Sequence, residues 1–130
     1  MKVLFYASAE TGRTGKELQS LIENLLGTEQ VEVFRTVDNM ARRLCRSRAG
    51  ICITVLLVAH GEELDRIIPL GYLFDDLGLL LVLPEDDPRL VAAGHELHPR
   101  FLTHVGNMGG DFRDVEAVLQ KKLKHDVKAA

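Results

Sequence analysis

The sequence has no tryptophan, and phenylalanine and tyrosine together make up only 5% of its 130 residues. A core with so few aromatic rings has to be built from leucine, valine and isoleucine. Hydrophobic residues make up 46% and charged residues 27%, a balance typical of a globular domain and not of a disordered chain. We therefore expect one domain over residues 1–125, followed by a frayed tail over residues 126–130.

The sequence also has few cysteines, no long hydrophobic run and no strong charge of one sign. Cys45 and Cys52 form neither a Cys-x-x-Cys pair nor a zinc-type set, and their apolar neighbours predict two small buried side chains. Residues 3–9 are too short for a signal peptide, and no segment approaches the length of a membrane span. The net charge of −3 argues against binding to nucleic acid. We expect a cytoplasmic protein that binds neither nucleic acid nor a membrane.

Short apolar runs alternate with amphipathic stretches along the whole chain. Strands are predicted at residues 3–7, 31–34, 51–59, 79–83 and 101–105, each followed by a helix. Uninterrupted β-branched runs are typical of parallel strands that are buried on both faces. The alternation predicts a doubly wound three-layer α/β/α sandwich around a five-stranded parallel sheet, with strand order 2-1-3-4-5.

Capping residues predict where the helices begin. Thr14 and Glu17 form a capping box for the first helix, and Asp38 is the expected cap of the second. Asp87 followed by Pro88 predicts the start of the fourth helix, and Asp111 the start of the last. Pro69 is expected to close a short third helix over residues 62–68.

Ligands of doubly wound folds bind beyond the carboxyl ends of the strands, near the switch point between strands one and three. The order of elements over residues 2–124 resembles the receiver domains of response regulators. The clearest local match is Phe101-Leu102-Thr103-His104, a turn, and then Asp111-Phe112-Arg113-Asp114-Val115. The resemblance implies that residues of the phosphorylation site align with Ala7 and Ser8 (the acidic pair), Val58 (the phosphoacceptor aspartate), Pro84 (the hydroxyl residue) and His104 (the lysine).

None of these catalytic identities is kept, although Phe101 retains the aromatic switch position. Magnesium needs oxygen ligands and an acyl phosphate needs a carboxylate, which Ala7 and Val58 do not offer. The resemblance therefore implies a non-catalytic pseudo-receiver in signalling. It would bind a protein partner, or a second copy in a homodimer, through the face of helix four, strand five and helix five. The acids at positions 62, 63 and 65 are expected to be solvated charges.

A second hypothesis is a flavodoxin-like domain that binds a small ligand. The hydroxyl-rich loop before the first helix, with Ser8, Thr11, Gly12 and Thr14, could hold the phosphate of FMN or a nucleotide. Thr11-Gly12-Arg13-Thr14 is similar to the flavodoxin Thr-Gly-x-Thr segment, with one extra residue after Ser8. A flexible, capped loop without a ligand is the competing interpretation.

His60 and His104 each follow a predicted strand at the carboxyl edge of the sheet. They could approach each other and bind a metal or respond to pH, and the simpler interpretation is two polar loop residues. His95-Glu96-Leu97-His98 lacks the spacing of a zincin motif. No catalytic set can be assembled, so we predict no enzymatic activity, no cofactor and no metal.

Overall fold

The computed structural model describes residues 2–47, 49–106 and 112–129, with side chains up to residue 123. Its strands are β1 (Lys2–Ala7), β2 (Val31–Phe34), β3 (Ile51–Leu57), β4 (Gly78–Leu83) and β5 (Phe101–His104). They form one parallel sheet in the order β2-β1-β3-β4-β5. The predicted strand order and the doubly wound topology are confirmed.

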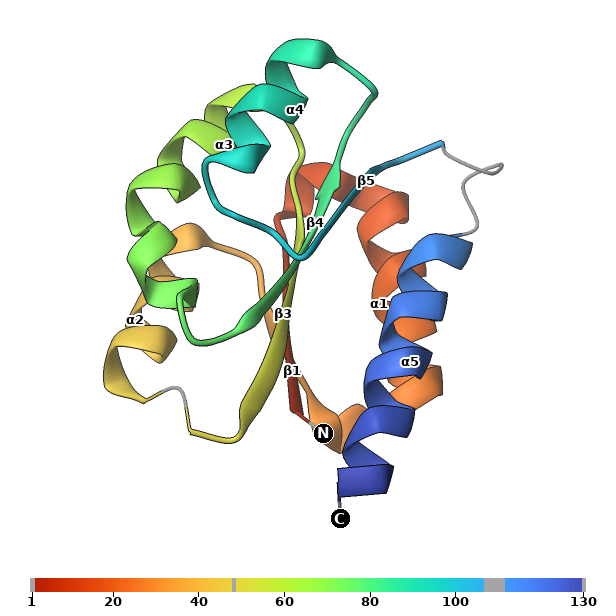
Figure 1. Cartoon of the computed structure of the whole chain (residues 1–130). Coiled ribbons are helices and arrows are strands. Elements are labelled where there is room, and N and C mark those ends of the chain that lie inside the picture. Colours follow the sequence, from red (N-terminus) through yellow and green to blue (C-terminus); the bar gives the residue numbers. More distant parts are fainter. Residues whose placement is uncertain (1, 48, 107–111, 130) are drawn as a thin grey trace.

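The helices lie on both faces of this sheet. The α-helices are α1 (Gly12–Leu26), α2 (Val37–Arg46), α3 (Gly61–Ile67), α4 (Pro88–His95) and α5 (Arg113–Ala129). In the described residues, 3₁₀ segments follow β1, α1 and α3: η1 (Ala9–Thr11), η2 (Thr28–Gln30) and η3 (Ile68–Phe74). Figure 1 shows α1 and α5 on one face of the sheet and α2, α3 and α4 on the other. This is a three-layer α/β/α sandwich.

Each face of the sheet packs into its own hydrophobic layer. Tyr6 and Leu81 belong to the layer under α2, α3 and α4, whereas Phe5 and Leu80 belong to the layer under α1 and α5. All residues of β4 are buried. Alternate side chains of the central strands therefore meet helices on both faces, which explains why these strands have no polar face in the sequence.

Two helix starts differ from the prediction. Thr14 lies inside α1, which begins at Gly12 directly after η1, so the capping box at Thr14 and Glu17 is wrong. The second helix is capped by Thr36, whose hydroxyl accepts the Asn39 N–H at 3.1 Å, and not by Asp38. Asp87 caps α4 as predicted, because its carboxylate accepts the Arg89 N–H at 2.8 Å.

Other boundaries shift by a few residues. The third α-helix ends at Ile67, one residue before the predicted end, and the 3₁₀ segment η3 continues the chain through Pro69 to Phe74. The last helix extends to Ala129, past the domain end predicted at residue 125. The turn at residues 107–110 and the cap at Asp111 lie outside the described residues. No helix in the described part of the chain has both the length and the apolar character needed to cross a bilayer.

The prediction of two buried cysteines is wrong. Cys45 is exposed and Cys52 is half-buried, and both are free thiols. Cys45 follows the buried Leu44, and its own position on α2 faces solvent. Arg43 on α2 forms an ion pair with Glu32 on β2 at 2.8 Å.

Candidate functional site

The receiver-like positions do not converge on one pocket. Val58 and Pro84 line a small pocket of about 180 Å³ at the carboxyl edge of the sheet, together with Glu10, Thr11, Thr14, Leu57, Ala59 and Val105. Ala7 is completely buried and Ser8 is 9% exposed. His104 lines a different small pocket, close to the start of α5. Glu10 is the one carboxylate among the described residues that line the 180 Å³ pocket.

The loop with the predicted phosphate-binding residues is closed by its own hydrogen bonds. The Thr11 N–H and the Thr11 hydroxyl both donate to the Ser8 carbonyl, at 3.0 and 2.6 Å. The Gly12 N–H donates to the Ala9 carbonyl, and Gly12 has a φ of +56°, which favours glycine. These two amides therefore do not point toward a ligand. A phosphate could reach them only after the loop had rearranged.

A cluster of titratable side chains lies beside this loop. Glu10 from η1 accepts a hydrogen bond from His60 Nε2 at 2.7 Å. His60 is the N-cap of α3, and its Nδ1 accepts the Glu63 N–H at 3.2 Å. Since Nδ1 is an acceptor, the ring proton of neutral His60 resides on Nε2 and is donated to Glu10. The cap thus fixes the tautomer of His60.

Glu63 completes the cluster from a buried position. Its side chain is 1% exposed, so the prediction that it is a solvated charge is wrong, whereas Glu62 and Asp65 are exposed as expected. Its Oε1 accepts the Ala59 N–H at 3.0 Å, and its carboxylate also accepts the Tyr6 hydroxyl. Burial raises the pKa of Tyr6 well above its usual value, and the charge and hydrogen bond of Glu63 act in the same direction.

The cluster borders a cleft of about 650 Å³ at the carboxyl ends of β1 and β2. Its walls come from the segment after β1, the segment after β2, and α3 with η3: Tyr6, Ser8, Ala9, Glu10, Arg35, Thr36, Val37, Asp38, Glu63, Arg66 and Leu70. Arg35 donates to the Ala7 carbonyl at 3.1 Å and also to the Gln19 side chain. The cleft therefore combines carboxylates with two guanidinium groups, on the side of the sheet that carries α2 and α3.

His60 and His104 have separate partners. His104 Nε2 lies 4.0 Å from an Asp86 carboxylate oxygen, and the contact of its Nδ1 is with the Val105 carbonyl at 3.1 Å. His60 instead contacts Glu10 and Glu63. The structure therefore supports a cluster around His60 that does not include His104. Phe101 is half-buried and packs against the layer under α1 and α5.

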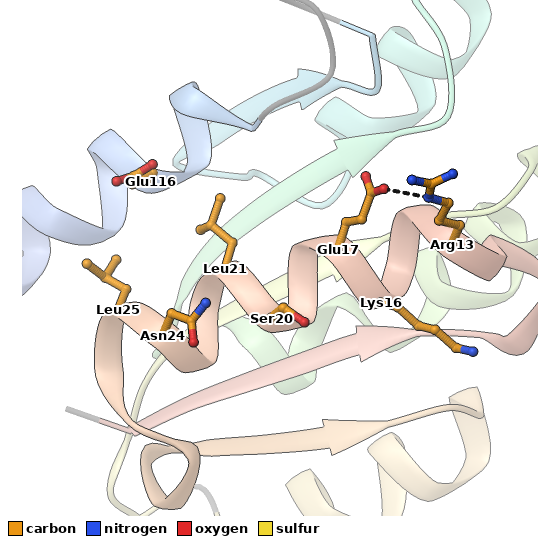
Figure 2. A pocket seen from close by; sticks show the side chains of 8 residues that line it. All are labelled: Arg13, Lys16, Glu17, Ser20, Leu21, Asn24, Leu25 and Glu116. Atoms are coloured by element: carbon orange, nitrogen blue, oxygen red, sulfur yellow. Dashed lines mark hydrogen bonds and ion pairs between the residues drawn. The ribbon is translucent and has the colours of Figure 1, made fainter.

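A second surface feature is a groove that runs along α1, on the side of this helix that faces α5. This groove has a volume of about 660 Å³. In Figure 2, Leu21 and Leu25 lie on the side of α1 that faces α5, and Glu116 lies across from them. The Arg13–Glu17 ion pair, at 2.9 Å, lies at one end of the groove. Both leucines also pack against the core layer, so the groove is a shallow gap between helices.

The sequence contained one signal for the missed cluster. Glu63 follows the N-cap His60 by three residues, the spacing at which a capping-box glutamate turns back toward the helix start. Glu10 could not be found in this way, because 50 residues separate it from His60.

Comparison with known proteins assigns the chain to no family. No family model matches it, and neither a curated protein nor a solved structure matches it. The class is therefore defined by the fold. The chain is a three-layer α/β protein of the doubly wound, flavodoxin-like type, with a polar cluster and a cleft at the carboxyl edge of its sheet.

Proposed function

We propose that this chain is a non-catalytic, receiver-like module of a signalling system that binds a protein partner or a second copy of itself. One observation carries the proposal. The strand order of a receiver is present, while Ala7 and Val58, at the ends of β1 and β3, are buried apolar residues. Phosphoryl transfer to an aspartate needs a carboxylate and a magnesium ion held by oxygen ligands, and these two positions supply neither.

The proposed interaction surface is the face formed by α4, β5 and α5. β5 is an edge strand that pairs with β4, so its other edge offers backbone N–H and C=O groups to a partner. Ala92 on α4 and Ala117 on α5 are exposed, and their small side chains would let a partner approach these helices closely. These features support association through the edge of the sheet.

Self-association can be tested by sedimentation equilibrium on the full chain. We expect a concentration-dependent dimer whose dissociation constant rises at least about tenfold in Ala92→Glu and Ala117→Glu, a change equivalent to about 1.4 kcal/mol. Asn39→Glu, at an exposed position of α2, is the matched control and should leave the dimer unchanged. A chain that stays monomeric would contradict the homodimer, and equal effects of all three variants would contradict the assigned face.

The loss of phosphorylation chemistry has its own test. Incubation with acetyl phosphate and magnesium should give no phosphoryl adduct by intact-mass spectrometry. A covalent adduct would overturn the non-catalytic part of the proposal, whatever the oligomeric state.

The cleft favours a second candidate, a domain that binds a phosphate-containing small molecule such as FMN or a nucleotide. Arg35 and Arg66 line the cleft, and guanidinium groups bind phosphate through paired N–H donors. Ser8 belongs both to this cleft and to the loop before α1. Stabilisation of the chain by FMN or ATP in thermal unfolding, reduced in Arg66→Gln, would favour this candidate. An unchanged melting temperature with both compounds would contradict this second candidate.

A further inference from the structure

Glu10, His60 and Glu63 each place a ligand atom within 4.8 Å of the other two. They come from η1, from the residue before α3 and from α3 itself, so the fold brings them together at the carboxyl edge of the sheet. Two carboxylates and one imidazole form a donor set that suits zinc and other first-row divalent ions. We propose that Glu10, His60 and Glu63 bind a divalent transition-metal ion of the zinc type.

The surroundings of Glu63 support a cation at this place. The Ala59 N–H and the Tyr6 hydroxyl that bond to its buried carboxylate are both neutral donors. A buried carboxylate is costly unless a positive charge or a metal compensates it. Arg66 lines the same cleft, and a divalent ion bound to the Glu63 carboxylate would compensate its charge directly.

Ser8 provides an independent observation. It is 9% exposed, and its Oγ has no hydrogen-bond partner among the described residues. Ser8 lines the same cleft as Glu10 and Glu63. Because a buried hydroxyl without a partner is destabilising, a water molecule on the metal ion would be a favourable partner for it. Three protein ligands leave a coordination position for such a water.

Metal binding must move the ring proton of His60. In the structure that proton lies between Nε2 and Glu10, and the metal takes its place. A neutral imidazole carries one ring proton, so that proton moves to Nδ1 when the metal binds Nε2, and the ring releases none. Nδ1 then no longer accepts the Glu63 N–H, and the cap bond of α3 is exchanged for a metal–nitrogen bond.

The test is a titration of the untagged full chain with Zn²⁺ by calorimetry and with Co²⁺ by visible absorption, in a Cys45→Ser background. That background removes the exposed thiol, which could otherwise bind the ions. We expect saturable binding of one equivalent. His60→Asn and Glu10→Gln should each weaken it by on the order of a hundredfold, and ¹⁵N NMR should show the His60 proton moving from Nε2 to Nδ1.

The variants are chosen so that the fold is kept. Asparagine is a preferred N-cap residue, so His60→Asn can still accept the Glu63 N–H, and Glu10 is a largely exposed side chain. Glu62→Gln, on the same helix, and His104→Gln, beside Asp86, are the matched controls and should bind like the parent. Absence of saturable binding, an unchanged affinity in His60→Asn, or loss of binding in His104→Gln would each overturn the proposal. None of these results depends on the oligomeric state or on phosphorylation.

Discussion

At the scale of single residues, Tyr6 and Glu63 form a polar pair inside a mainly apolar layer. Both are about 1% exposed, and the layer around them is composed mainly of leucine and isoleucine. The hydroxyl of Tyr6 donates a hydrogen bond to the Glu63 carboxylate, and the Ala59 N–H donates a second one. The pair therefore connects β1 to α3 by a hydrogen bond that is largely shielded from solvent.

The Tyr6–Glu63 pair predicts instability in alkali. The pKa of Tyr6 is raised in the folded chain, so the folded state keeps the hydroxyl proton at high pH. In the unfolded chain the same hydroxyl ionises above about pH 10. The free energy of unfolding therefore falls as the pH rises above this value. In a Tyr72→Phe background, urea unfolding should show this loss, and Tyr6→Phe should remove it. At neutral pH, Tyr6→Phe should lower the free energy of unfolding by roughly 1–3 kcal/mol, because Glu63 loses a donor. An unchanged alkaline slope in Tyr6→Phe would contradict this.

Glu32 on β2 predicts a weaker effect in acid. Its carboxylate accepts two hydrogen bonds from Arg43, at 2.8 and 3.0 Å, and pairs with Lys2 at 3.3 Å. These contacts, chiefly that with Arg43, hold the pKa of Glu32 below its usual range. The stabilisation is therefore fully present above the pKa of this glutamate in the unfolded chain, about 4.3. It is lost as the pH falls through the lower pKa of Glu32 in the folded chain.

Glu32→Gln should lower the free energy of unfolding by about 1 kcal/mol at neutral pH, since both partners are partly exposed. The difference from the parent should shrink as the pH falls below about 4. Chemical denaturation across this range measures both effects. Glu29→Gln, at an exposed position of η2, serves as the control and should match the parent. A pH-independent difference for Glu32→Gln would mean that packing, and not charge, is responsible.

At the scale of elements, the start of α1 depends on a close contact between Thr11 and Gly15. A Cβ atom on Gly15 would lie 2.2 Å from Thr11 Oγ1 and 3.4 Å from the Ala7 Cβ. The Thr11 hydroxyl cannot easily rotate away, because it donates to the Ser8 carbonyl. Gly15→Ala should therefore lower the free energy of unfolding by about 1–3 kcal/mol.

A double-mutant cycle separates this contact from a general effect of alanine. The cost of Gly15→Ala should be smaller in a Thr11→Ala background, where the hydroxyl is absent. It should stay large in Thr11→Ser, which keeps the hydroxyl and loses the methyl group. Urea unfolding of the six proteins gives the coupling energy. Equal costs in all three backgrounds would show that the Thr11 hydroxyl does not determine the local conformation.

The elements also show which local features the sequence could predict. The apolar runs of β3 and β4 indicated buried parallel strands, and Asp87 with Pro88 located the start of α4. The capping box at Thr14 was wrong because η1 makes the chain turn earlier, so that Thr14 is already inside α1. Local sequence preferences could not reveal this, because they do not include the hydrogen bonds that close the loop on the Ser8 carbonyl.

At the scale of the whole molecule, the strand order could be predicted because short crossovers and two-sided burial leave few topologies. The edge at which doubly wound folds bind their ligands follows from the same topology. The cluster of Glu10, His60 and Glu63 could not be predicted, since its geometry depends on how η1 packs against the start of α3. Contacts between residues so distant in sequence are set by packing and leave no periodic pattern.

The two core layers share one sheet, so we predict that neither unfolds without the other. Leu80 and Leu81 are neighbours on β4 that face opposite layers, and each is completely buried. Leu80→Ala and Leu81→Ala should each lower the free energy of unfolding by about 2–5 kcal/mol. In a Tyr72→Phe background, Tyr6 fluorescence reports the layer under α2, α3 and α4, while far-ultraviolet circular dichroism reports all helices.

Both signals should change at the same urea concentration in the parent and in both leucine variants, because removal of either layer exposes the apolar side chains of β4. The alternative is that the layers are independent, as they would be if each were stabilised mainly by contacts between its own helices. Leu81→Ala would then lower the urea midpoint of the Tyr6 fluorescence transition below that of the dichroism transition. Leu80→Ala would leave the midpoint of the Tyr6 transition unchanged. Coincident transitions in all three proteins therefore require that the sheet, and not helix–helix contact, couples the two faces.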